Sequence, residues 1–115
     1  MNLTSAAQRL AAGESVSGHP VGNSMRPLVP SGARVVIVPS VVERLEVDDI
    51  VLVRVTGRVY LHKILAIDDA RRRVQIGNNS GGVNGWTGLD KVFGICVEVD
   101  GVARPRLDGK TRHAA

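Results

Sequence analysis

Cysteine, aromatic residues and long apolar runs are all scarce in this chain of 115 residues. The single cysteine, Cys96, excludes an internal disulfide and a cysteine-rich zinc site. Its place in the apolar run 92–97 predicts a small buried core residue rather than a reactive thiol. No run approaches the roughly 20 apolar residues that a membrane-spanning helix needs, and residues 1–6 lack the basic and apolar regions of a signal peptide. We therefore expect a cytoplasmic protein without a membrane span.

Positive charge is in excess, with a net charge of +4 and a pI near 10.0. Such a balance permits weak attraction to nucleic acids or acidic surfaces. Much of the excess lies in residues 71–73 and 104–112, and neither segment is interleaved with the aromatic side chains that stack on bases. We interpret the first segment as a solvated turn and the second as part of a loose tail.

The length and composition favour one domain that can bury a core, because hydrophobic residues make up 43% of the chain. Residues 3–12 favour a short helix that ends at Gly13. From Val21 onward, short β-branched runs alternate with turn-forming residues. The predicted strands are residues 33–38, 50–55, 58–67, 73–76 and 91–99.

Turn signals at residues 56–57 and 68–71 predict that most of these strands run antiparallel. We expect an all-β fold, a mostly antiparallel coiled sheet or partly open barrel, over residues 18–100. A short helical arm, residues 1–17, precedes this domain. A flexible basic tail, residues 101–115, follows it.

A lone serine, Ser24, stands in a compact turn, residues 22–28, just before an apolar run. A serine hydroxyl is a weak nucleophile until a positioned base takes its proton. His62, on the predicted strand 58–67, is a candidate base, since an imidazole with an unperturbed pKa near 6.5 works at neutral pH without the desolvation that lysine needs. Taken singly, Ser24 suits a turn and His62 a half-buried strand position. Taken together, they predict a Ser–His site.

Several short blocks along residues 22–99 occur in an order that one clan of peptidases shares. They are residues 22–28, similar to the nucleophile box; 31–35, where the clan usually has Gly-Asp before a strand; 45–52, similar to a second Gly-Asp-Ile-Val turn; 60–64, in the place of the base-bearing strand; 76–79, similar to a Gly-Asp-Asn turn; and 92–97, similar to the closing strand. In these blocks the chain resembles the serine peptidase clan that contains type I signal peptidases and the LexA and UmuD self-cleaving proteins.

This resemblance implies that Ser24 is the nucleophile and that its backbone N–H helps to hold the oxyanion. It implies a base at His62, the position where bacterial signal peptidases and LexA-like proteins hold lysine. The endoplasmic-reticulum and archaeal signal peptidases hold histidine there, followed by a basic residue, which Lys63 matches. Because neighbouring strand residues point to opposite faces, only one of His62 and Lys63 can face Ser24, and we favour His62.

Three positions depart from the pattern of the clan. Gly22 stands where many bacterial signal peptidases carry a hydroxyl residue that helps to hold the oxyanion. Asn78 and Asn84 stand near places where relatives carry aspartate. An asparagine oxygen can fix the imidazole tautomer but cannot neutralise the imidazolium. Asn84, Asn78 and Lys63 are therefore candidate supporting residues for His62.

Two further features near these positions have simpler interpretations. Residues 68–69 could supply a carboxylate to the base, but two adjacent aspartates before Ala70 suit a turn better. Trp86 ends a Gly- and Asn-rich loop, residues 78–86, and we interpret it as a packing anchor rather than a substrate clamp.

The sequence therefore predicts a Ser24–His62 endopeptidase that binds an extended peptide or protein segment beside a sheet edge and uses no metal or cofactor. The clan's preference implies a small residue before the cut. Too few residues precede Ser24 for a DNA-binding domain. An Ala-Gly bond at residues 12–13, of the kind that self-cleaving relatives cut, lies too close to Ser24 to reach it in cis.

Other functions remain open at this stage. Preprotein processing at a membrane is disfavoured, because the chain offers neither a span nor an amphipathic substitute. The main alternative is a catalytically weak or inactive module, regulatory or phage-related, that binds a partner's extended segment. Nucleic-acid binding rests on charge alone. A homodimer is also left open by the sequence.

Overall fold

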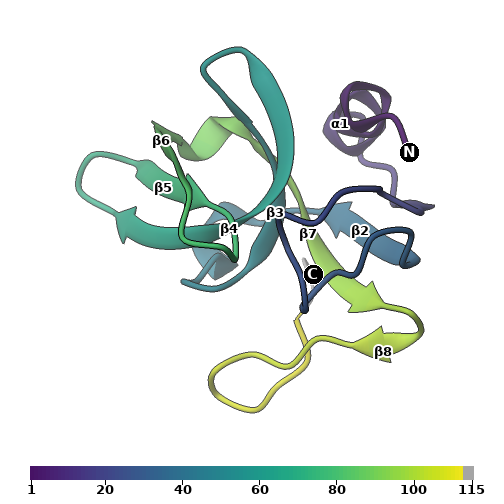
Figure 1. The fold of residues 1–115 in the computed structure, drawn as a ribbon. Helices are drawn as coiled ribbons and strands as arrows, with labels where there is room; N and C mark the ends of the chain where they lie inside the picture. Colours follow the sequence, from purple (N-terminus) through teal and green to yellow (C-terminus); the bar gives the residue numbers. More distant parts are fainter. Residues whose placement is uncertain (113–115) are drawn as a thin grey trace.

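The computed structural model describes residues 1–112, which form a curled antiparallel sheet with one short helix against it (Figure 1). The elements are α1 (Leu3–Ala11), β1 (Val16–Gly18), β2 (Val35–Pro39), β3 (Ile50–Val55), β4 (Arg58–Asp68), β5 (Arg73–Gly77), β6 (Val83–Gly88), β7 (Val92–Val99) and β8 (Val102–Ala103). Short 3-10 helices, Val42–Arg44 and Leu89–Lys91, precede β3 and β7.

The strands lie in the order β1-β2-β7-β3-β4-β5-β6, and β8 pairs with the end of β7. Every pairing is antiparallel and the sheet is open, which confirms the predicted all-β fold. The predicted turn at residues 56–57 joins β3 to β4. Thr56 and Gly57 both have positive φ, 49° and 81°, as a two-residue hairpin loop of type I′ requires.

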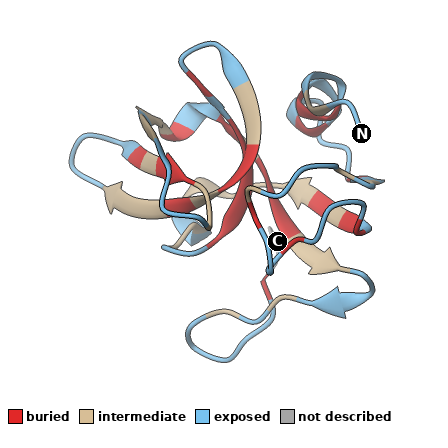
Figure 2. Ribbon diagram, viewed as in Figure 1, coloured by how far each residue is buried: buried red, intermediate tan, exposed pale blue. Residues whose placement is uncertain are grey.

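Two apolar clusters form the core, and alternate residues of β3 divide between them. Buried residues follow one another along the central strands of the sheet (Figure 2). Ile50 and Leu52 belong to the first cluster, whereas Val51 and Val53 belong to the second, as the period of two in a strand requires. All four are fully buried. The predicted core position of Cys96 is confirmed, since its thiol is buried in the first cluster.

Helix α1 covers the first cluster with the apolar face that contains Ala6, Ala7 and Leu10. The helix begins where the side-chain oxygen of Asn2 accepts the N–H of Ser5 at 2.9 Å, which is a typical N-cap bond. The helix lies close to β7 at Gly94. A Cβ atom at this position would lie 2.8 Å from Leu10 Cδ1.

Three strands lie outside the predicted ones, namely β1, β6 and β8. Residues 83–86, expected to be the end of a Gly- and Asn-rich loop, instead belong to β6, because this strand pairs with β5 along the whole length of β5. Trp86 is 40% exposed on this strand and so does not anchor a loop in the core. The hydroxyl of Thr87 donates to the carbonyl of Arg54 at 2.9 Å, so β6 curls back toward β3.

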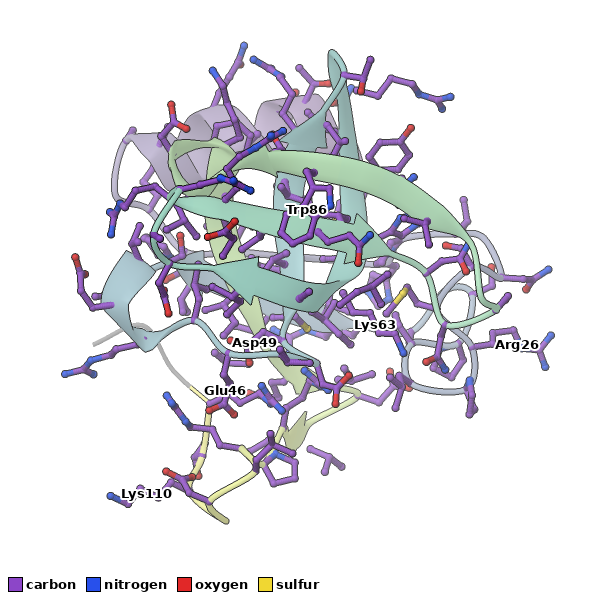
Figure 3. All side chains as sticks on the ribbon, turned by 90° about the vertical axis from the view of Figure 1, so that its left-hand side faces the viewer. Arg26, Glu46, Asp49, Lys63, Trp86 and Lys110 are labelled. Atoms are coloured by element: carbon purple, nitrogen blue, oxygen red, sulfur yellow. The ribbon has the colours of Figure 1, made fainter. Side chains whose placement is uncertain are left out.

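The described part of the expected flexible tail, residues 101–112, is held against the domain instead (Figure 3). Arg106 pairs with Glu46 at 3.0 Å. Arg112 pairs with both Glu46 and the buried carboxylate of Asp49, just before β3. Composition alone suggested a solvated tail, but these acidic partners lie about sixty residues earlier in the chain. Residues 113–115 of the predicted tail lie outside the described residues.

Candidate functional site

The turn that carries Ser24 is anchored by two buried side chains, which flank the exposed residues 26–28. Met25 and Val29 are both buried, and the N–H of Val29 donates to the carbonyl of Met25 at 2.9 Å. Gly22 has a φ of 125°, which glycine adopts far more readily than other residues. The turn therefore holds Ser24 in a defined place while leaving its side chain half-exposed.

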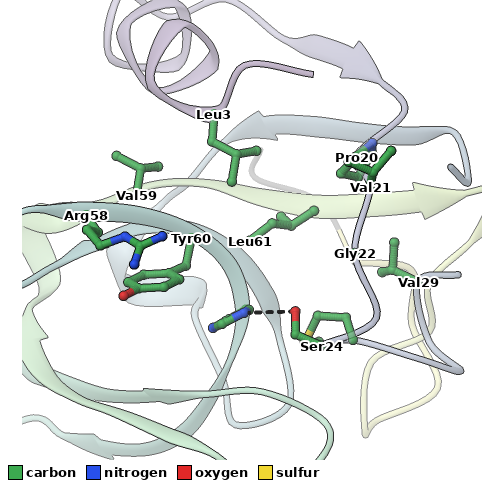
Figure 4. A pocket seen from close by; sticks show the side chains of 12 residues that line it. Leu3, Pro20, Val21, Gly22, Ser24, Val29, Arg58, Val59, Tyr60 and Leu61 are labelled. Atoms are coloured by element: carbon green, nitrogen blue, oxygen red, sulfur yellow. Dashed lines mark hydrogen bonds between the residues drawn. The ribbon is translucent and has the colours of Figure 1, made fainter. Parts of the chain in front are cut away.

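His62 lies in the middle of β4, opposite Val51 of β3, and is 8% exposed. Its Nε2 atom lies 3.1 Å from the hydroxyl oxygen of Ser24 (Figure 4). Tyr60, on the same face of β4, stacks on the imidazole with ring centroids 4.9 Å apart and planes 26° apart. The structure thus brings the two residues singled out as nucleophile and base within hydrogen-bond distance.

Asn84 makes the second hydrogen bond to the imidazole, with its Oδ1 atom 2.7 Å from Nδ1 of His62. The pairing of β5 with β6 shifts register beside residues 76–77, which leaves Asn84 as the extra residue of a β-bulge. The next residue, Gly85, has a φ of 126°, a conformation that favours glycine. Because an amide oxygen accepts, Nδ1 carries the proton and the Nε2 lone pair faces the Ser24 hydroxyl.

Lys63, the alternative base, supports the turn of Ser24 through Asn79. Its ammonium group donates to Asn79 Oδ1 at 2.9 Å. Asn79 in turn donates its backbone N–H to the carbonyl of Ser24 at 2.8 Å and its side-chain N–H to the carbonyl of Arg26 at 2.9 Å. The structure therefore connects Lys63 to the backbone of the nucleophile turn, whereas His62 contacts the hydroxyl itself.

The other residues considered as supports for the base serve local turns. Asn78 accepts the N–H groups of Ser80 and Gly82, at 2.9 and 2.8 Å, and so closes the loop before β6. Asp68 accepts the N–H of Arg71 at 3.1 Å, consistent with the turn expected there. Of the candidate supporting residues Asn78, Asn84 and Lys63, the structure brings only Asn84 to the imidazole.

Sequence reasoning missed the roles of Tyr60, Asn79 and Gly85 in this arrangement. The place of Tyr60 beside His62 could have been predicted, because residues two apart on a strand share a face and Tyr60 precedes His62 by two positions. Asn79 and Gly85 had none, since the contacts of Asn79 and the bulge beside Gly85 depend on the pairing of distant segments.

The backbone N–H of Ser24 is a hydrogen-bond donor close to the Ser24 hydroxyl. Within residues 1–112, the backbone N–H of Ser24 donates to no backbone or side-chain acceptor. Backbone N–H groups of this kind stabilise the oxyanion of acyl transfer. The Ser24 N–H is therefore free to donate to a group bound beside the Ser24 hydroxyl.

Burial lowers the pKa of His62 below its usual 6.5, and the hydrogen bond that His62 donates to Asn84 opposes this shift. Desolvation disfavours the charged imidazolium, whereas an acceptor at Nδ1 stabilises it. Because desolvation is the larger effect, His62 is neutral at pH 7. Neutral imidazole is the form that can take a proton from Ser24.

If Ser24 reacts with peptides through His62, kcat/KM is expected to rise with an apparent pKa below 6.5 and to reach a plateau at neutral pH. The reason is that the neutral imidazole is the form that can accept the Ser24 proton. Measuring kcat/KM between pH 4.5 and 10 checks this. A rise centred above pH 8 would instead assign the base to Lys63.

The same shift makes folding stability depend on pH. The folded-state pKa of His62 lies below its unfolded value of 6.5, so the unfolded chain binds more protons as the pH falls through that range. The stability due to neutral His62 is complete above pH 6.5 and declines below it. Comparing unfolding of the native chain with that of His62→Gln isolates this contribution from other histidines.

A pocket of about 190 Å³ adjoins the Ser24 hydroxyl and the imidazole (Figure 4). Its wall is mixed: polar groups line more than half of the surface, and apolar side chains come from Leu3 of α1, Met25 and Val29 of the turn and Leu61 of β4. No group of three or more His, Cys, Asp or Glu residues in the described part of the chain could hold a metal ion. None of the described helices is long and apolar enough to cross a membrane.

Comparisons with protein-family models, curated proteins and solved structures found no match to this chain.

Proposed function

We propose that this protein is a serine endopeptidase in which Ser24 is the nucleophile and His62 the general base. The observation that carries the proposal is the chain of two hydrogen bonds from Ser24 Oγ through the imidazole to Asn84 Oδ1, 3.1 and 2.7 Å long. Nucleophile, base and orienting group in this order form the Ser–His–acceptor arrangement of acyl-transfer enzymes. The adjoining pocket offers a place for a substrate side chain.

In the proposed reaction, Ser24 Oγ attacks the carbonyl carbon of a peptide bond while its proton passes to Nε2 of His62. The carbonyl oxygen becomes an oxyanion near the N–H of Ser24. The C–N bond then breaks as His62 returns the proton to the leaving amine, which leaves an acyl group on Ser24. Water, deprotonated by His62, attacks this ester and releases the carboxylic acid and free Ser24. The reaction requires no metal ion or cofactor.

The ordered blocks shared with the signal peptidase and LexA clan support the same assignment. In the proposal, His62 replaces the lysine of bacterial relatives, and the substrate is an extended peptide or protein segment, with the cytoplasm as the place of action. The lowered pKa of His62 is in keeping with a base that works at neutral pH.

A reagent that phosphonylates activated serines tests the proposal directly. We expect a fluorophosphonate to modify the native chain once, at Ser24, as measured by intact mass and peptide mapping. Ser24→Ala should prevent the modification, whereas Ser80→Ala, a control in the nearby exposed loop, should leave it unchanged. No modification of the native chain, or undiminished modification of Ser24→Ala, would contradict the proposal.

One observation favours a second candidate function, a binding module with weak or no turnover. The group that orients His62 is the neutral amide of Asn84, which cannot neutralise the imidazolium that forms during attack. A partner's extended segment would then occupy the same pocket without being cut. Retention of such binding by Ser24→Ala, with no fluorophosphonate modification of the native chain, would support this alternative.

Asn84→Asp is expected to raise kcat/KM by about tenfold or more at pH 8, because a carboxylate at this position stabilises the imidazolium. It should also raise the pKa of His62. Steady-state hydrolysis across the pH range measures both effects. Asn78→Asp is the matched control, since Asn78 contacts loop N–H groups rather than the imidazole. An equal effect of the two substitutions would show that Asn84 does not act through His62.

A further inference from the structure

The pocket beside Ser24 has one charged side chain in its lining within residues 1–112, that of Arg58. Arg58 is the first residue of β4 and lies at the rim of the pocket, close to Tyr60 (Figure 4). The other titratable side chains of the described lining are those of Tyr60 and His62, and neither is acidic like Asp or Glu. The pocket thus combines apolar side chains and uncharged polar groups with a single permanent positive charge.

Arg58 is held in place by an aromatic ring rather than by a carboxylate. Its guanidinium carbon lies 5.5 Å from the centroid of the Tyr60 ring, and Tyr60 in turn stacks on His62. Cation–π contact orients the guanidinium and leaves its N–H groups free to donate. In the described part of the chain, Arg58 forms no salt bridge.

We infer that Arg58 is a specificity-determining residue that binds a carboxylate of the substrate, so that the enzyme prefers peptides with an acidic group close to the scissile bond. This inference rests on the proposed function. A guanidinium presents paired N–H groups that match a carboxylate, and the absence of an acidic side chain in the described lining leaves this charge without an internal partner. The apolar side chains of the pocket would then accept a neighbouring aliphatic side chain.

Arg54 provides a matched control for the charge of Arg58. It lies on β3, is also exposed, and its guanidinium carbon is 5.6 Å from the centroid of the Phe93 ring. It does not line the pocket beside Ser24. If positive surface charge in general attracts acidic substrates, substitution of either Arg54 or Arg58 would reduce the preference for them. If Arg58 binds the carboxylate specifically, only the Arg58 variants would lose the preference.

The test compares two fluorophosphonates of equal length, one ending in a carboxylate and the other in a primary amide. We expect the native chain to react with the carboxylate probe about two- to fivefold faster, the range for an exposed charge pair. Arg58→Gln should bring the ratio of rates near one, and Arg58→Glu should invert it. Arg54→Gln should preserve the native ratio. A native ratio near one, or equal losses in the Arg54 and Arg58 variants, would overturn the inference.

Peptides distinguish the two sources of a substrate carboxylate. One pool of amidated peptides carries an internal Glu, its match carries Gln, and a third carries Gln with a free C-terminal carboxylate. Preferential cleavage of the first pool would show that Arg58 recognises an acidic side chain. Preferential cleavage of the third pool would show that it recognises the C-terminal carboxylate. Equal cleavage of all three would contradict the inference while leaving the proposed peptidase activity intact.

A binding measurement separates the two proposals if the native chain reacts with neither probe. That result would contradict the peptidase proposal. Fluorescence anisotropy of the labelled Glu and Gln pools with Ser24→Ala then tests Arg58 by itself. If Ser24→Ala binds the Glu pool more tightly than the Gln pool, and Ser24→Ala/Arg58→Gln does not, carboxylate recognition by Arg58 is supported. Equal binding of the two pools by Ser24→Ala overturns it.

Discussion

Replacing His62 with Gln is expected to lower kcat/KM for peptide hydrolysis by about 10⁴-fold or more, which is the scale of losing the base in a Ser–His site. Glutamine can still hydrogen-bond Ser24 and Asn84, but it cannot take the Ser24 proton. Steady-state hydrolysis and the rate of fluorophosphonate modification both measure the effect. Above pH 6.5, where His62 is neutral, we expect little change in folding stability.

Lys63→Gln is the matched control for this substitution, because the two residues are neighbours on β4. The ammonium group of Lys63 donates to Asn79. Asn79 in turn donates to the carbonyl groups of Ser24 and Arg26 and so holds the turn in place. We expect a smaller loss, about tenfold, since glutamine retains a donor for Asn79 while the turn becomes less well held. If Lys63→Gln lost more activity than His62→Gln, the base would be Lys63.

Arg112→Ala is expected to destabilise the fold by about 3 kcal/mol, because it leaves the carboxylate of Asp49 buried without its cation. Asp49 is 1% exposed and Arg112 3% exposed. The backbone carbonyl of Asp49 also accepts the N–H of Ile64, which connects this charge pair to β4, the strand of His62. Thermal or urea unfolding at neutral pH measures the loss, and a decrease in Tm of about 10 °C or more corresponds to it.

Lys110→Ala supplies the control in the same segment, since this residue is exposed and a surface substitution there should change stability by less than about 0.5 kcal/mol. The double variant Asp49→Ala/Arg112→Ala should lose less stability than the sum of the single variants, because it removes both charges together. Equal stabilities of Arg112→Ala and Lys110→Ala would contradict this prediction and would support the flexible tail that composition predicts.

Most strands could be predicted from the sequence, because residues such as Ile50 and Val53 belong to β-branched runs bounded by turn signals. The strand β6 could not, since its Gly- and Asn-rich start is typical of a loop, and its pairing with β5 stabilises the extended form. The packing of Arg112 could not be predicted either. A buried cation requires a buried anion, and nothing local to residues 101–112 indicates Asp49 as the partner.

The candidate site was predictable only in part. Ser24 and His62 could be paired from their chemistry and from the order of the surrounding blocks. The choice of Asn84 over Asn78 as the group that orients His62 could not be made, because both lie in the same polar stretch. A bulge beside Gly85 turns Asn84 toward the imidazole, while Asn78 closes its own loop.

By itself, the sequence determined the all-β class, the core place of Cys96 and the candidates Ser24 and His62, since these depend on residue type and local period. Only the tertiary structure decided which side chains meet: His62 with Ser24, Asn84 with His62 and Arg58 at the pocket rim. The physical reason is that strand pairing, register shifts and the burial of charges are set by contacts between distant segments, which local patterns do not encode.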